Sequence, residues 1–169
     1  MKRLVHIAAL LGAILVMVLE PLPALANPVP VPTACTVMPQ DLFEHPRILG
    51  MPTTGSGLQA AVMTVTVLDS SGVPIPYAHV QMVFGSACTD LCFCPGAVLE
   101  GYTNASGVVE LVMALGGCCQ DPTAATLLVM GMPIRIYDTV ASPDRSSGTG
   151  GGDCSGRLLD FSTFGGCFG

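Results

Sequence analysis

Eight cysteines restrict the folding of this chain more than any other feature of its sequence. An even number of cysteines in a small exported protein is typical of a disulfide framework. Spacing alone does not give the pairing, because eight cysteines allow about a hundred complete sets of bridges. We therefore treat every one of them as a disulfide candidate: Cys35, Cys88, Cys92, Cys94, Cys118, Cys119, Cys154 and Cys167.

An export signal precedes all of the cysteines. Lys2 and Arg3 come before an apolar run over residues 7–19, and the small-residue pattern Ala-Leu-Ala ends at Ala26. This arrangement is typical of a secretory signal peptide. The run is also shorter than the roughly 20 residues of a membrane span. We predict a signal peptide over residues 1–26 and a secreted or cell-envelope protein with no membrane span after cleavage.

The chain after residue 26 is acidic. Of the 6 Lys and Arg and 12 Asp and Glu residues, the signal contains Lys2, Arg3 and Glu20, which leaves 4 minus 11, a net charge of −7. No basic stripe offsets this charge, and a phosphate backbone would be repelled. The composition therefore excludes nucleic acid as a partner.

The exported part divides into three regions. Residues 27–60 are rich in proline and predict an extended leader. Residues 61–141 alternate apolar and polar side chains between turn signals, as half-buried strands do. Residues 142–169 contain a glycine-rich linker and a tail with two cysteines. The middle region is thus the single expected domain.

Six strands are expected in that domain, over residues 61–67, 78–84, 98–103, 108–114, 124–130 and 134–140. We expect the third and fourth to pair as a hairpin across the turn at 104–107. No helix-length periodicity is present, which predicts an all-β sandwich. The expected core is Val65, Val67, Val80, Met82, Phe84, Val109, Leu111, Met113, Leu128 and Ile136.

Two segments resemble a known family. VTVLDSSGVPIPYAHV at 65–80 and GYTNASGVV at 101–109 are similar to bacterial Ig-like domains of the invasin and intimin type, and to carboxypeptidase-regulatory-like and prealbumin-like sandwiches. The resemblance implies an Ig-like Greek-key β-sandwich with a structural, adhesive or ligand-presenting role, and the cysteines predict that this sandwich is disulfide-stapled. The sequence departs from the family at Asn104, where Asp is more frequent, and in the cysteine-rich insertion over residues 88–95.

The tail carries a second resemblance. DCSGRLLDFSTF at 153–164 resembles one half of a dockerin-type calcium repeat. Counting back from Asp160 as the twelfth loop position puts Thr149 at the first position and Gly151 at the third, and neither offers a carboxylate there; we take Asp153, Ser155 and Asp160 as the candidate ligands. We expect no bound metal and no cofactor.

The cysteines of the insertion leave three interpretations open, and one of them, redox activity, has no Cys-x-x-Cys at a helix start to support it. Disulfides from the loop containing Cys88, Cys92 and Cys94 to the Cys118-Cys119 corner are expected in an oxidising compartment. The same thiolates could instead enclose a zinc ion, although their spacing differs from that of paired Cys-x-x-Cys ligands.

Catalysis is not expected. The exported part contains two histidines, His45 and His79, and neither lies in a motif with a nucleophile and an orienting acid. The sequence therefore predicts a secreted, non-catalytic module that contacts a protein or glycan at the cell surface. A metal-binding protein, using zinc at the cysteine cluster or calcium at the tail, is the alternative.

Overall fold

The computed structural model describes residues 28–39, 47–51, 61–144 and 154, so that the predicted signal peptide lies outside the described residues. Every regular element in these ranges is a β-strand. None of the described residues forms a helix long and apolar enough to cross a membrane.

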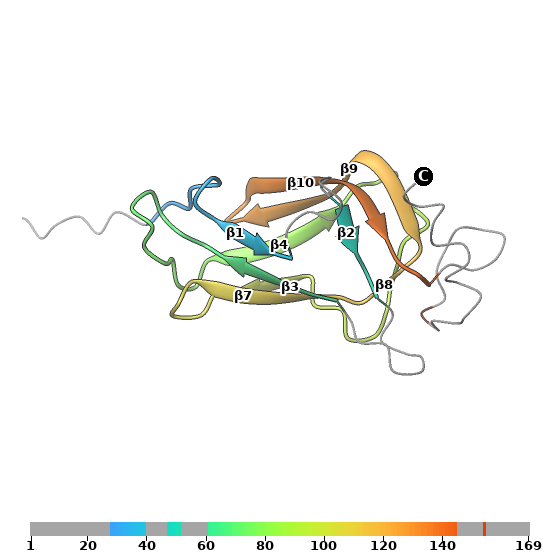
Figure 1. The fold of residues 1–169 in the computed structure, drawn as a ribbon, viewed down its shortest axis with the longest axis horizontal. Coiled ribbons are helices and arrows are strands. Elements are labelled where there is room, and N and C mark those ends of the chain that lie inside the picture. Colours follow the sequence, from blue (N-terminus) through green and yellow to red (C-terminus); the bar gives the residue numbers. More distant parts are fainter. Residues whose placement is uncertain (1–27, 40–46, 52–60, 145–153, 155–169) are drawn as a thin grey trace, which may run out of the picture.

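The strands form two larger sheets and one small sheet (Figure 1). The three-stranded sheet has the order β1 (Thr36–Met38), β3 (Ala61–Thr66) and β7 (Val108–Met113). The five-stranded sheet has the order β2 (Arg47–Leu49), β10 (Met132–Ala141), β9 (Cys118–Val129), β4 (His79–Phe84) and β6 (Glu100–Tyr102). The small sheet pairs β5 (Cys92–Phe93) with β8 (Leu115–Gly116).

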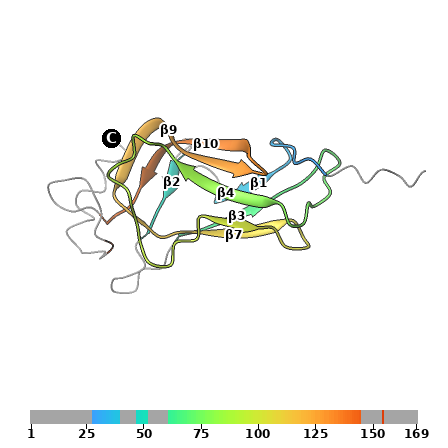
Figure 2. The ribbon, with the colours of Figure 1, turned by 180° about the vertical axis from the view of Figure 1, so that it is seen from behind.

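The two larger sheets enclose one hydrophobic core. The five-stranded sheet curls into a half-barrel over the three-stranded sheet (Figures 1 and 2). Val65 and Leu111 contribute to the core from the three-stranded sheet, and Val80 and Leu127 contribute from the other; all four are fully buried. The expectation of an all-β protein is confirmed.

Strand β3 forms where the alternation of the sequence predicts it. Met63 and Val65 point into the core, while Thr64 and Thr66 on the opposite face are half-buried. This period of two is the geometry of a strand with one buried face. The strand pairs with β7 in antiparallel register along its whole length.

The expected hairpin between residues 98–103 and 108–114 is reduced to one isolated antiparallel bridge, between Val98 and Val112. The turn itself is present, because Asn104 Oδ1 accepts hydrogen bonds from the backbone N–H groups of Ser106 and Val108. However, β6 pairs with β4 and β7 pairs with β3, so the chain changes sheet at the turn. The buried Thr103 fixes this corner: its hydroxyl donates to the Ile75 carbonyl oxygen at 2.7 Å.

The last two strands form a long hairpin. Their turn at Met130 and Gly131 has positive φ angles of 50° and 80°, which fits a two-residue type I′ turn. The observed β9 begins six residues before the predicted strand and contains Pro122. This proline lies where the register with β10 shifts between Gln120 and Ala125, and a register shift is a position at which a strand accepts proline.

Two predicted core residues lie on the wrong face. Ile136 is 49% exposed and Leu128 is half-buried, whereas the neighbouring Tyr137 and Leu127 are buried. The run Leu127-Leu128-Val129 is apolar on both faces, so its sequence does not show which face is internal. Strand β10 also shifts register after Pro133, which breaks the alternation counted along the sequence. Phe84 and Val109 are partly buried against the core.

The described part of the proline-rich leader joins both sheets. Strand β1 pairs with β3, and β2 lies parallel to β10. Val37 and Ile48 are buried in the core, at 6% and 2% exposure. The leader therefore contributes an edge strand to each larger sheet, which its proline content did not indicate.

Candidate functional site

Most of the described cysteines gather at one end of the molecule. The connection from β4 to β6, residues 85–99 and called the cysteine loop below, contains β5 and three cysteines. Strand β5 pairs with β8, with Cys92 opposite Gly116 and Phe93 opposite Leu115. The loop is thereby held beside the segment that leads into β9.

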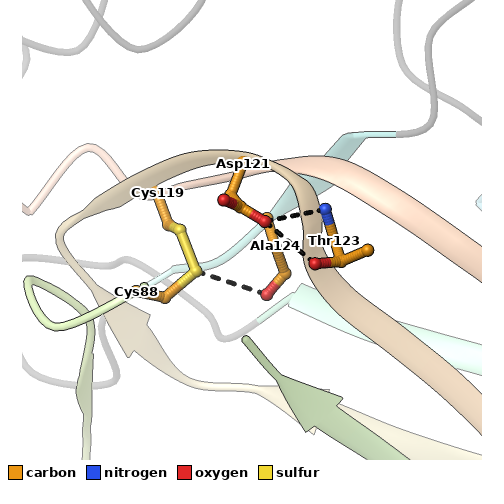
Figure 3. Close-up of a disulfide and its surroundings, with 5 residues drawn as sticks. All are labelled: Cys88, Cys119, Asp121, Thr123 and Ala124. Atoms are coloured by element: carbon orange, nitrogen blue, oxygen red, sulfur yellow. Dashed lines mark hydrogen bonds between the residues drawn. A yellow bond between two sulfur atoms is a disulfide. The ribbon is translucent and has the colours of Figure 1, made fainter. Parts of the chain in front are cut away.

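A disulfide joins the cysteine loop to the start of β9. Cys88 is bonded to Cys119, with their Cα atoms 5.1 Å apart. Cys88 Sγ lies 3.4 Å from the Ala124 carbonyl oxygen (Figure 3). Asp121 Oδ1 accepts hydrogen bonds at 2.9 Å from the backbone N–H and the hydroxyl of Thr123, which shapes the irregular part of β9 beside the bridge (Figure 3).

Gly117 allows the loop to approach β9 closely. Its φ of +90° favours glycine, and a Cβ atom there would collide with the Asp90 carbonyl oxygen. Its N–H donates to the Asp144 carbonyl oxygen at 2.7 Å, and its own carbonyl accepts from Ser142 N–H at 2.9 Å. Gly117 therefore connects the cysteine loop to the segment that precedes Cys154.

Three cysteines and one acid meet beside this glycine. Cys94 is bonded to Cys154, and Cys92 Sγ lies 3.5 Å from Cys154 Sγ. Asp144 is fully buried, and its Oδ2 accepts a hydrogen bond from Cys154 N–H at 2.5 Å. One ligand-type atom from each of these residues lies within 4.8 Å of the others. We call Cys92, Cys94 and Cys154 the three-cysteine cluster.

The disulfide candidates divide into two groups. Bridges hold Cys88, Cys94, Cys118, Cys119 and Cys154, whereas Cys167 lies outside the described residues. Cys35 and Cys92 are thiols in this structure. Cys35 lies beside Leu68, next to the end of β3 at Thr66. The other end of β3 pairs with Met113, from which the chain leads to β8 and the cysteine loop. Cys35 is thus remote from the other described cysteines.

The predicted zinc ligands are not brought together as one set. Cys88 and Cys119 form their own bridge, and Cys118 is also oxidised. The described cluster instead contains Cys154 from the tail, and two of its three sulfur atoms are bonded to each other. Of the calcium candidates, Asp153, Ser155 and Asp160 lie outside the described residues.

Asp144 is a member of this site that the sequence did not predict. It stands in a Ser-Pro-Asp-Arg stretch that predicts only a polar loop, and no motif marks it. Its burial results from the hydrogen bonds of the segment to Gly117. A polar contact away from this site joins His79 Nε2 to Glu100 Oε2 at 3.4 Å, on the partly exposed face of β4 and β6.

The cysteine loop also exposes an aromatic side chain. Phe93 is 52% exposed, and its ring lies 5.2 Å from that of Phe84. Since successive strand residues point to opposite faces, Phe93 faces outward where Cys92 and Cys94 face the cluster. The bridged loop therefore presents a supported aromatic group to solvent.

A cavity of about 80 Å³ lies elsewhere, between β2 and β3. Its lining is mostly apolar and includes Ile48, Met63 and Tyr137. Its volume is well below the several hundred Å³ of typical small-molecule sites. The cysteine loop is therefore the stronger candidate site within the described residues.

Comparison with known proteins gives no relative to guide the assignment. No protein-family model, no curated protein and no solved structure matches this chain.

Proposed function

We propose that this chain is an exported, non-catalytic Ig-like module that presents its cysteine loop to a protein or glycan partner at the cell surface. The observation that carries the proposal is the pair of disulfides that hold this loop while Phe93 remains exposed. Rigid aromatic groups contribute large contact area at a small cost in conformational entropy, and they are frequent in binding surfaces.

The strand order supports an Ig-like Greek-key sandwich. If β1, β3 and β7 are strands A, B and E, and β4, β9 and β10 are strands C, F and G, the neighbours in the sheets are A-B-E and C-F-G. These are the neighbours in the immunoglobulin fold. The curled five-stranded sheet adds β2 and β6 at its two edges.

Two features support export. Disulfides form and persist in oxidising compartments outside the cytosol, and five described cysteines are oxidised. The amino-terminal sequence has the charged, apolar and small-residue regions of a secretory signal.

A binding screen with matched variants tests the proposal. The chain from residue 27 onward is immobilised and exposed to panels of glycans and of extracellular proteins. We expect at least one saturable interaction, which Phe93→Ala weakens about tenfold or more, as loss of an interface anchor does. Tyr77→Ala is the control, because it also removes an exposed aromatic side chain, 78% exposed in this case. Tyr77 lies before the start of β4, whereas the cysteine loop begins after the opposite end of that strand.

The alternatives give different results. Binding that Phe93→Ala leaves unchanged would place the partner site elsewhere and contradict the proposed role of the loop. A stoichiometric metal ion in the native mass spectrum of the exported protein, together with unbridged Cys94 and Cys154, would favour a metal-binding protein instead.

A further inference from the structure

The three-cysteine cluster combines a thiol with a disulfide at contact distance. Cys92 is a thiol, and its Sγ lies 3.5 Å from Cys154 Sγ, which is bonded to Cys94. Cys92 and Cys94 are separated by one residue on an extended segment, so both side chains point to the same face. Cys154 therefore lies beside two alternative partners.

We propose that the three-cysteine cluster is a thiol–disulfide exchange site, in which the bond to Cys154 moves between Cys94 and Cys92. This activity goes beyond the binding role proposed above and does not depend on it. The Cys92 thiolate attacks Cys154 Sγ, the Cys92–Cys154 bond forms, and the Cys94–Cys154 bond breaks. Cys94 leaves as a thiolate and takes up, through water, the proton that Cys92 lost. The number of disulfides is unchanged, so no oxidant or reductant is consumed.

The attack requires a small side-chain movement. In-line attack places the three sulfur atoms in a row, so that the distance from Cys92 Sγ to Cys94 Sγ would be the sum of the 3.5 Å contact and a bond of about 2 Å. The three sulfur atoms lie within 4.8 Å of one another, which is shorter than that sum. Cys92 must therefore rotate about its Cα–Cβ bond to approach in line. The Cys92 residue is half-buried at one face of β5, whereas Cys94 is only 3% exposed.

The surroundings keep Cys154 in place during the exchange. The Asp144 carboxylate accepts a hydrogen bond from the backbone N–H of Cys154, and the Asp144 carbonyl oxygen accepts one from the backbone N–H of Gly117. Strand β5 is held by its pairing with β8. Both ends of the reacting group are thus attached to the sheets, and residue 154 stays covalently tethered in either isomer.

The two isomers differ in the thiol that reagents can reach. With the Cys94–Cys154 bond, the remaining thiol is the half-buried Cys92; with the Cys92–Cys154 bond, it is the buried Cys94. Exchange would therefore hide or expose a thiol without any change in the oxidation state of the protein.

Disulfide mapping of the oxidised exported protein tests the exchange. The protein is held at neutral pH, quenched and alkylated in acid, and digested with pepsin, which suppresses further exchange. Cleavage after Phe93 separates Cys92 from Cys94, so that mass spectrometry distinguishes the isomers. In the wild-type protein we expect two isomers. One has the Cys94–Cys154 disulfide and an alkylated Cys92, and the other has the Cys92–Cys154 disulfide and an alkylated Cys94.

Three variants make the result decisive. In Cys94→Ser, Cys92 should bridge to Cys154, and neither should be alkylated. In Cys92→Ser, only the Cys94–Cys154 bridge should be present. Cys35→Ser is the matched control, since it removes a thiol that takes no part in the cluster and should leave both isomers.

Either of two results would overturn the proposal. It fails if alkylated Cys94 is absent from the wild-type protein, and it fails if Cys92 and Cys154 are both alkylated in Cys94→Ser. If Cys94→Ser is not secreted, the wild-type labelling decides alone: alkylated Cys94 supports exchange, and its absence rejects it. Binding by the cysteine loop is a separate measurement, so either proposal can fail without the other.

Discussion

Cys88 and Cys119 lie 31 residues apart in the sequence, yet their disulfide brings their Cα atoms to 5.1 Å. The bridge attaches the cysteine loop to the start of β9, beside the irregular part of that strand (Figure 3). It closes a loop that contains β5, β6, β7 and β8. The loop end of the molecule therefore depends on this covalent link.

Removal of that bridge should destabilise the protein. We expect the double variant Cys88→Ala with Cys119→Ala to lose about 3 kcal/mol in free energy of unfolding, because a closed loop of this length restricts the unfolded chain. Denaturant titration measures the loss. Cys35→Ala is the control and should cost less than about 1 kcal/mol, since Cys35 is a thiol that closes no loop and lies next to the end of β3 at Thr66, away from the cysteine loop. Equal losses in both variants would show that the bridge adds no stability.

The corner at Thr103 should be sensitive to loss of one hydroxyl. Its Oγ1 donates to the Ile75 carbonyl oxygen at 2.7 Å and accepts from Ala78 N–H at 2.9 Å. Thr103→Val keeps the shape but leaves two buried backbone groups unpaired, so we expect a loss of about 3 kcal/mol. Thr66→Val, on the half-buried outer face of β3, should change stability by less than about 0.5 kcal/mol. Thermal or urea unfolding measures the stability of both variants. Equal losses in Thr103→Val and Thr66→Val would contradict the role given to the Thr103 hydroxyl.

Gly117→Ala should disturb the cysteine loop as well as the backbone. The positive φ alone costs about 1 to 2 kcal/mol, and the new Cβ would also collide with the Asp90 carbonyl oxygen. Gly72→Ala separates the two effects, because Gly72 has a φ of +75° with nothing within 4 Å of the Cβ position. We expect Gly117→Ala to be the more destabilising by about 1 kcal/mol or more. Faster alkylation of Cys92 in Gly117→Ala would accompany that loss, and unchanged alkylation would contradict the packing described.

Adjacent leucines in β9 test the register of the core. Leu127 is fully buried and Leu128 is half-buried on the opposite face. We expect Leu127→Ala to cost about 2 to 5 kcal/mol through lost burial and the cavity that it leaves. Leu128→Ala should cost about 1 kcal/mol. The reverse order in chemical unfolding would mean that β9 pairs one residue out of the register described.

The strands near the two turn motifs could be predicted because their information is local. In β3, β4 and β7, apolar residues alternate with polar or less buried ones, and Asp69 and Asn104 bind the backbone of their own turns. The period of two therefore places Val65, Val80 and Leu111 in the core without knowledge of their neighbours. The bridge between the cysteine loop and the Cys118-Cys119 corner could also be expected, although its particular pairing could not.

By itself, the sequence determined that the chain is all-β, where most strands lie and that cysteines cross-link it, because each of these depends on residues close together along the chain. Only the tertiary structure decided the sheet to which each strand belongs, the face that Leu128 presents and the meeting of Asp144 with the three-cysteine cluster. These depend on backbone hydrogen bonds between distant segments, such as Gly117 to Asp144. Such bonds can form between any residues with an N–H and a C=O group, and so they leave no mark in the sequence.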